Sequence, residues 1–507
     1  MPETLTWLSK QPTAKPYGKL EIYWDAGTGW VDETSFAILP ITGSCGITSP
    51  GDSLSDLGKG PVAEMSVQVD NETGRYSVDV AGSLANTYGI FQKQIRFTAG
   101  YYNSLGVALT QQMFIGRIQQ APLDAFTATA QLSCYGFEHD IQQHRIRTEA
   151  YGDGGDGGLA QNTNAIIALV LALTGLTITY NPDFNYIVVP WWYGEDDDAY
   201  TEMREAAESE LGVVWVNPQT GYLEFWSSAY WVGKASTDTY TFQSENAKPD
   251  RDYSNIFDKV VVHYQPRRKG RTRVLYQLQQ PITIAPATTG TIVEMKLQHE
   301  QAQYVSFNSN ARTAGGASMT TSMTITIIEQ TARLWRVQFD NSNVRHALVV
   351  DTFNILGRPL EGMPDRFYEA NAAVPLTVSR RTDIRATEER ARFAMQTYAQ
   401  AKLIGDLKVF RTSGPPPTIM LGPMPCNPTL NVGSIITLDL SAVASVAMDE
   451  DVILLSRNWS FGNRFEDNWY AVVRSYMDTL IHVSDSVTPD GYFKIGVSHL
   501  DEGKLYR

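Results

Sequence analysis

Residues 63–70, AEMSVQVD, decide the fold class of this chain. Apolar side chains at every second position alternate with polar ones, which is the period of a β-strand with one buried face. The stretch runs into DNETG at 70–74, where Asx residues and a glycine supply turn geometry and positive φ. The sequence therefore predicts a half-buried strand that ends in a chain reversal.

Short strands of the same kind recur on both sides of this stretch. Candidates lie at 20–24, 94–99, 113–118 and 127–135. Their even spacing between turn-rich segments favours a small barrel or sandwich. We expect residues 1–150 to form an N-terminal arm and a first β-barrel-like module. Because 507 residues exceed what one core supports, further modules must follow.

The composition changes at residues 152–158, GDGGDGG, which carry no side chain able to build a core. Alternating Gly and Asp also occur in calcium-binding repeats, but this segment does not recur along the chain. The sequence favours a flexible connector over a calcium loop, and it marks the end of the first module.

A small α+β module is expected at 159–248. Its first helix is predicted at 165–174, with Thr163 or Asn164 as N-cap and Gly175 as the stop signal. The helix is apolar nearly all round, and we therefore expect it to be buried.

A second helix is predicted at 200–211, and apolar strands at 213–216 and 222–226 flank a turn-rich loop that predicts a hairpin. The acidic run at 195–198 precedes the helix. Carboxylates at a helix start cap free amides and complement the macrodipole, so capping is favoured over a hard-cation site.

Residues 249–386 are expected to form a second β-barrel-like module. Its candidate strands lie at 259–264, 273–278, 291–297, 322–328, 333–339 and 347–355. Gly and Pro at 357–360 are expected to stop the pairing. A third helix is bounded by Thr387 and Gly405, and residues 387–507 are expected to hold this helix, a closing β segment and a C-terminal tail. The expected fold class is mainly β with an α+β insertion.

Composition disfavours several classes of function. A formal net charge of -14 opposes a phosphate backbone, so stable DNA binding is not expected, although acidic walls would let DNA slide past. Cys45, Cys134 and Cys426 are too scattered for a disulfide framework or a zinc site. The longest apolar stretch, 165–176, is too short to cross a bilayer, so no membrane-spanning segment is expected.

No motif in the sequence gathers catalytic or cofactor-binding groups. His139 and His144 form the closest histidine pair, and a surface or interface role is favoured over a metal site. Nucleophile elbows and phosphate-binding glycine loops are absent. Paired carboxylates for glycoside cleavage stay open, because that pair is defined in space. We therefore predict no catalytic, cofactor-binding or metal residues, and no cofactor.

One aromatic cluster stands out, at Trp191, Trp192 and Tyr193. Such residues are enriched in subunit interfaces, and an interface is the favoured interpretation. The alternative is a carbohydrate-binding or glycan-cleaving protein, in which these rings together with Trp226 and Trp231 stack on sugars.

A series of individually weak segments carries a family resemblance over most of the chain. These segments are 67–71 with Gly74 and Arg75, 114–118, 132–135, 165–175, 200–225, and the 357–360 turn before the Thr387 helix. In this order they resemble the baseplate hub proteins at the tail tip of long-tailed bacteriophages and related injection particles. In those proteins two β-barrel-like modules flank a smaller α+β insertion.

The resemblance implies a homotrimer whose paired barrels form a ring that closes the tail tube and gates genome passage. Implied partners are the distal tail or tail tube protein, the tape-measure protein, and tail fibre or tip proteins, with DNA only in transit. The implied location is the tail tip of the virion, after assembly in the host bacterial cytoplasm. The resemblance implies no catalytic residues. Residues 1–17 match no part of the family pattern, and a threading arm onto a neighbour is one option for them.

Overall fold

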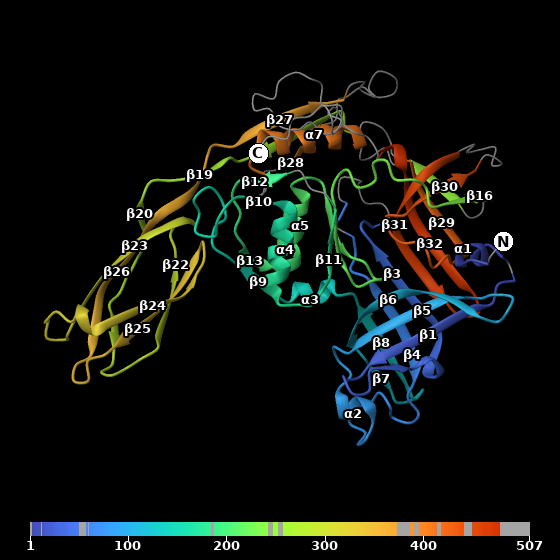
Figure 1. Ribbon diagram of the computed structural model, residues 1–507, viewed down its shortest axis with the longest axis horizontal. Coiled ribbons are helices and arrows are strands. Elements are labelled where there is room, and N and C mark those ends of the chain that lie inside the picture. Colours follow the sequence, from blue (N-terminus) through green and yellow to red (C-terminus); the bar gives the residue numbers. More distant parts are fainter. Residues whose placement is uncertain are drawn as a thin grey trace.

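The computed structural model describes residues 3–11, 13–49, 57–58, 60–183, 187–241, 247–251, 257–372, 386–389, 395–412, 417–440 and 449–476. Strands dominate this part of the chain and helices are few (Figure 1). The predicted mainly β fold class with a small α+β part is confirmed. The predicted C-terminal tail, from residue 477 onward, lies outside the described residues.

A 14-stranded sheet forms the right-hand part of the molecule in Figure 1. Its main path runs β17-β29-β32-β31-β3-β4-β8-β6-β5-β1-β2, and the strand predicted at 63–70 is β4 in its middle. Its strands are β1 (Pro16–Tyr23), β2 (Trp30–Asp32), β3 (Ala37–Gly46), β4 (Glu64–Asp70), β5 (Gln94–Tyr102), β6 (Ala108–Gln120), β7 (Leu123–Asp124), β8 (Thr129–Tyr135), β16 (Asp238–Thr241), β17 (Ala247–Arg251), β29 (Pro417–Pro425), β30 (Ile435–Asp439), β31 (Asp449–Phe461) and β32 (Phe465–Val473). The short helices α1 (Leu5–Ser9) and α2 (Leu84–Tyr88) lie beside it.

An N-terminal strand and a C-terminal strand meet in this sheet where β3 pairs antiparallel with β31, a junction that we call the seam. Gly43 lies opposite Trp459, and a Cβ on Gly43 would lie 2.3 Å from the indole. The missing side chain makes room for Trp459, whose indole stacks on Phe97 with ring centroids 5.3 Å apart. Strands from residues 1–150 and from residues 387–507 therefore share one sheet and one core.

Barrel closure, expected for both β modules, is not seen in the described residues. The ladder of the large sheet has free ends at β17 and β2. The strands between residues 257 and 372 fall into separate sheets of three to five strands, again with free edges. The β modules are therefore open sheets as far as the structure describes them.

The α+β part lies in the centre of Figure 1. Helices α4 and α5 pack against the three-stranded sheet β11-β15-β14, and β14-β15 is the predicted hairpin. The elements are α3 (Glu138–Gln142), β9 (Arg145–Arg147), β10 (Gln161–Asn162), α4 (Thr163–Thr174), β11 (Tyr180–Pro182), β12 (Val188–Val189), β13 (Glu195–Asp198), α5 (Ala199–Glu208), β14 (Val213–Val216) and β15 (Leu223–Trp226).

Helix α4 differs from its prediction in two details. Its N-cap is Asn162, whose side chain accepts from the backbone N–H of Ala165, one residue before the predicted choices. The helix is buried on one face only, because Leu173 is 50% exposed. The predicted stop is confirmed, since Gly175 closes the helix with a left-handed φ of 69°.

Residues 267–362 form an elongated arm on the left of Figure 1. One sheet is built around the long β26, and the sheet β22-β25-β24 packs against it over a core that contains Trp335, Phe339 and Phe353. The strands are β19 (Arg267–Lys269), β20 (Arg273–Gln277), β21 (Ile282–Ile284), β22 (Thr291–Lys296), β23 (Gln301–Arg312), β24 (Met323–Gln330), β25 (Leu334–Asn341) and β26 (Leu348–Gly362).

The predicted end of pairing at 357–360 is wrong, because β26 continues to Gly362. Pro359 lies opposite Gln301, next to a register shift in the ladder with β23. A proline is tolerated at such an irregularity, where its missing N–H leaves no regular hydrogen bond unmade.

The predicted third helix is misplaced. Part of that segment forms β28 (Ala386–Glu389), a strand parallel to β18 (Lys259–Tyr264), which also pairs with β27 (Arg366–Asn371). The helix α7 covers Tyr398–Thr412 and passes through Gly405 instead of ending there. A Cβ on Gly405 would lie 3.0 Å from the Tyr368 ring, so the glycine lets α7 lie close to β27.

The glycine-rich segment 152–158 is folded, so the prediction of a flexible connector is wrong. The N–H of Gly152 donates to the carbonyl of Gly158 at 2.9 Å, and the segment packs on Trp191. A Cβ on Gly152 would lie 2.2 Å from that indole, so only glycine fits under the ring.

Asp156 fastens this segment to the arm. Its Oδ2 accepts hydrogen bonds from Gln301 Nε2 at 2.7 Å, from the backbone N–H of Tyr304 at 2.6 Å and from Gln330 Nε2 at 3.0 Å. The Asp156 carboxylate thus accepts hydrogen bonds from protein groups, whereas the calcium-loop alternative would place a cation there. The segment joins the α+β part to the arm.

Asp156→Ala is expected to loosen this joint. Three donors lose a charged acceptor, which costs about 1–3 kcal/mol when the donors stay away from water. We expect a lower melting temperature and faster proteolytic cleavage within residues 152–158. Asp153→Ala is the matched control, because Asp153 is an exposed carboxylate in the same segment. Equal effects of the two substitutions would contradict the role assigned to Asp156 at this joint.

Candidate functional site

The predicted interface aromatics are buried inside the chain. Trp191, Trp192 and Tyr193 are 4%, 3% and 1% exposed. Trp192 packs in the core of the α+β part, while Trp191 and Tyr193 pack with residues of the arm such as Leu360. The three rings therefore pack parts of one chain against each other.

The same finding applies to the rings named for the carbohydrate alternative. Trp226 and Trp231 are 3% and 1% exposed, and Trp226 stacks on Tyr230 with centroids 4.5 Å apart. A sugar needs an accessible ring face, which none of the proposed tryptophans offers.

The acidic run at 195–198 acts as predicted for a helix start. The carboxylate of Asp198 accepts from the backbone N–H of Thr201 at 2.9 Å and caps α5, and Asp196 forms a salt bridge with Arg147 at 2.7 Å. Of the two histidines, His139 lies on α3 and stacks on Tyr135. Within the described ranges, no three His, Cys, Asp or Glu side chains are grouped to hold a metal, and no helix is long and apolar enough to span a membrane.

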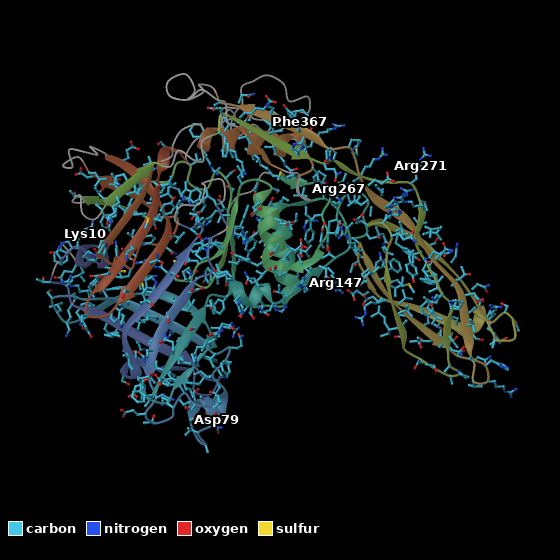
Figure 2. All side chains as sticks on the ribbon, turned by 180° about the vertical axis from the view of Figure 1, so that it is seen from behind. Lys10, Asp79, Arg147, Arg267, Arg271 and Phe367 are labelled. Atoms are coloured by element: carbon cyan, nitrogen blue, oxygen red, sulfur yellow. The ribbon has the colours of Figure 1, made fainter. Side chains whose placement is uncertain are left out.

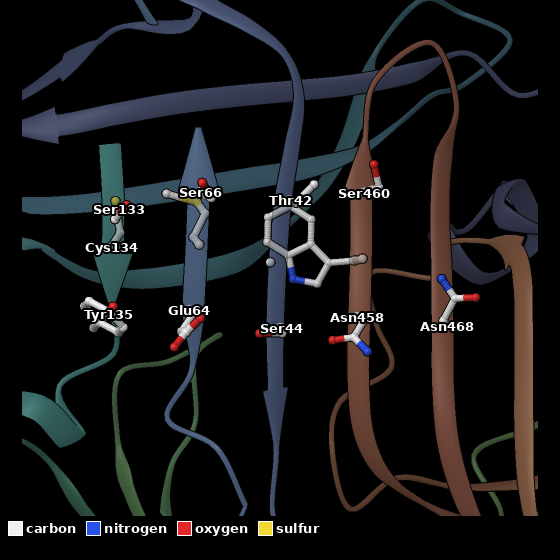
Figure 3. A pocket seen from close by; sticks show the side chains of 13 residues that line it. Thr42, Ser44, Glu64, Ser66, Ser133, Cys134, Tyr135, Asn458, Ser460 and Asn468 are labelled. Carbon is white, nitrogen blue, oxygen red and sulfur yellow. The ribbon is translucent and has the colours of Figure 1, made fainter. Parts of the chain in front are cut away.

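A polar recess of about 470 Å³ crosses the seam on one face of the large sheet (Figure 3). Strands β8, β4, β3, β31 and β32 contribute to it. Most of its side chains carry hydroxyl or amide groups, and Glu64 is the charged one. The polar neutral residues are Thr42, Ser44, Ser66, Ser133, Tyr135, Asn458, Ser460 and Asn468.

This recess offers many hydrogen-bonding groups. Its lining serines lie with one carboxylate, Glu64, and the lining includes neither histidine nor lysine. The Cys134 thiol is fully buried, which raises its pKa far above the ordinary value and keeps the proton on sulfur. The chemistry of the recess suits a contact surface.

A second recess, of about 780 Å³, lies where the arm joins the rest of the chain. We call it the basic recess. It is lined by Arg268, Lys269, Gly270, Arg271, Thr272, Arg273, Arg358 and Glu361. The cation-rich run RRKGRTR at 267–273 is its signal in the sequence. A net charge of -14 hides such a local excess, and the run was not predicted as a site.

Glu33 anchors the turn that follows β4, and no sequence motif predicts its role. Its carboxylate is fully buried and accepts hydrogen bonds from Trp24 Nε1 at 3.0 Å, from Tyr76 Oη at 2.8 Å and from the guanidinium of Arg75 at 2.7 and 2.8 Å. Arg75 belongs to the segments that carry the family resemblance. Its buried partner lies 42 residues earlier in the chain.

Glu138 predicts a pH dependence of stability. It is 3% exposed on α3, and burial raises its pKa to about 8. The folded chain therefore keeps a proton that the unfolded chain releases above its ordinary pKa of about 4.3. The protonated Glu138 side chain therefore contributes fully to the free energy of unfolding below a pH of about 4.3, and this contribution is lost as the pH rises towards 8.

Glu138→Gln is expected to raise the free energy of unfolding at pH 8 by an amount on the order of 3 kcal/mol, with little effect at pH 4. Melting temperatures of the two proteins across this range provide the measurement. Glu64→Gln, which removes an exposed carboxylate, is the control for the loss of one negative charge. Parallel profiles of wild type and Glu138→Gln would show that Glu138 is not the responsible group.

No protein-family model and no curated protein matches the sequence. Similar solved structures exist. The tail protein from Neisseria meningitidis MC58 superimposes with a TM-score of 0.50 at 7% identity, over 91% of this chain and 98% of that one. The 43 kDa tail protein of prophage MuSo2 from Shewanella oneidensis gives 0.47 at 9% identity, over 91% of this chain and 100% of that one. Prophage tail protein gp18 from Listeria monocytogenes gives 0.44 at 9% identity, over 89% and 94%. The chain thus has, along nearly its whole length, the fold of the tail protein from Neisseria meningitidis MC58.

Proposed function

We propose that this chain is a non-enzymatic structural subunit of a bacteriophage tail tip, a baseplate hub protein that closes the distal end of the tail tube. The observation that carries the proposal is the fold shared with the Neisseria meningitidis tail protein over 91% of this chain and 98% of that one. The surface chemistry agrees, because the polar recess on the large sheet is lined mostly by hydroxyl and amide groups that can make contacts.

In this proposal three copies form a ring that joins the tail tube or distal tail protein to tip or fibre proteins. The tape-measure protein and then DNA pass through its centre. A net charge of -14 suits such a passage, because acidic walls repel phosphates and let the polymer slide. The segments 1–150, 159–248, 249–386 and 387–507 are proposed as the parts of each subunit, of which the first and the last share the large sheet and its core.

Two measurements test the proposal. Mass photometry of the purified chain should give a species of three times the 56.4 kDa chain mass. Electron microscopy of tail particles that carry a tagged copy should place the label at the distal tip. A monodisperse monomer that is absent from tail particles would overturn the proposal.

The carbohydrate alternative predicts glycan binding that is lost in Trp191→Ala/Trp192→Ala. Because both rings are buried, we expect that double variant to lose stability and no glycan signal from the wild type. A glycan array with envelope fragments of the host checks this expectation. Binding by the wild type would revive the alternative at a different surface.

A further inference from the structure

The basic recess gathers five cations around one carboxylate. Arg268, Arg271, Arg273 and Arg358 are exposed, Lys269 is partly so, and Glu361 is the acid among the lining residues. Glu361 lies 3.5 Å from Arg268 and 3.7 Å from Arg273, so its charge is shared between two guanidinium groups. Figure 2 shows Arg271 on the outer side of the junction between the arm and the rest of the molecule.

The fold brings these cations together through the edge of the arm's larger sheet. Strands β19 and β20 pair with consecutive parts of β26, and the chain bends between them at Gly270. A Cβ on Gly270 would lie 2.6 Å from Glu361 Oε1, so the glycine allows the bend to lie over the carboxylate. Arg358 enters the recess from β26 itself.

The local charge is opposite to that of the rest of the chain. Five cations and one carboxylate give the recess a formal charge of +4, so the remainder of the chain carries -18 against the total of -14. Within the described chain, neither Arg271 nor Arg358 has an ion-pair partner. Like charges this close repel one another, and an anionic partner would relieve that repulsion.

A simpler explanation is that cations on an edge strand prevent unwanted strand pairing. One or two charged side chains are enough for that purpose. It does not explain Arg358, which comes from β26, a strand that is already paired on both sides. Arginine also pairs with carboxylates through two parallel hydrogen bonds, so four arginines favour a specific anionic partner over a general solvated edge.

We propose that the basic recess binds an acidic surface of a second copy of this chain, and so holds neighbouring subunits together. The inference rests on the proposed oligomeric function and names the surface that carries it. An acidic chain that assembles with itself must offset repulsion between copies, and this recess is where opposite charges can meet. A recess of about 780 Å³ has the size of a pocket that admits side chains. A DNA duplex would meet the repulsion of the acidic remainder of the chain.

The test reverses the two cations that have no ion pair to lose. Arg271→Glu/Arg358→Glu is compared with the wild type by analytical ultracentrifugation at 50 and 500 mM NaCl. At 50 mM we expect self-association to weaken at least tenfold, and at 500 mM the difference should shrink because salt screens the contact. Circular dichroism and melting curves should match the wild type, since all four guanidinium groups are exposed.

The control is Arg345→Glu/Arg464→Glu, which changes the net charge equally at exposed positions on other turns and removes only the 3.9 Å surface pair of Arg464 with Glu466. It should associate like the wild type. Unchanged association of the recess variant in an oligomeric wild type would overturn this inference and leave the proposed function standing. A wild type that is monomeric in solution and absent from tail particles would overturn both. Loss of binding to a 20-base-pair duplex, with association unchanged, would replace the inference with a DNA contact.

Discussion

Asp467→Ala is expected to destabilise the large sheet by about 3–5 kcal/mol, because it leaves a buried arginine charge without its partner. Asp467 on β32 and Arg457 on β31 are 0% and 2% exposed. The guanidinium donates to both carboxylate oxygens, at 2.8 and 2.6 Å. It also donates to the carbonyl oxygens of Leu430 and Asn427, so it has no route to water.

Urea unfolding, followed through the transition of the large sheet, measures the effect. Glu466→Ala is the matched control, since the neighbouring Glu466 pairs with Arg464 at 3.9 Å on the surface and should change stability by about 0.5 kcal/mol or less. Replacing both partners, in Asp467→Leu/Arg457→Met, should cost less than Asp467→Ala alone, because no unpaired charge remains. A double variant that is less stable than Asp467→Ala would refute this account.

The strands were largely predictable because their signals are local. Alternation at 63–70 gives β4, and the apolar runs around the turn at 217–221 give the β14-β15 hairpin. Both features depend on residues close in sequence, so periodicity and turn chemistry identify them. The stop at Gly175 follows for the same reason.

The seam was not predictable because its partners lie about 400 residues apart. Nothing in β3 specifies β31 as its neighbour, since pairing depends on register and packing in the folded chain. The same limit explains Glu33, whose partner Arg75 lies 42 residues away, and Asp156, whose donors lie in the arm. Local composition alone favoured a flexible segment at 152–158.

The candidate site was harder to predict from the sequence than the fold. Residue type alone predicts Trp191 and Trp192 as interface residues, whereas the folded chain buries both of them in its own packing. The basic recess was missed because total charge averages over the whole sequence. Five of the seven residues at 267–273 are cations, and this is visible in the sequence. Arg358 lies beside them only because β26 brings it there in the folded chain.

Trp459→Ala is expected to cost about 3–5 kcal/mol, because it removes a large buried side chain from the seam. The indole is 4% exposed and packs between Phe97 and Gly43. Since the seam joins β3 to β31, its loss should also expose these two strands to proteases. Trp7→Ala, which removes a tryptophan that is 44% exposed, is the control and should have a much smaller effect.

A double-mutant cycle separates the fit of the indole over Gly43 from general loss of volume. Gly43→Ala alone should destabilise the seam by about 1–3 kcal/mol, because its Cβ would lie 2.3 Å from the indole. In the Trp459→Ala background the same change should cost much less, since the added methyl group then has space. Additive costs in urea unfolding would mean that the two positions do not interact. A coupling above about 1 kcal/mol would show that this one contact helps to hold β3 and β31 in a single sheet.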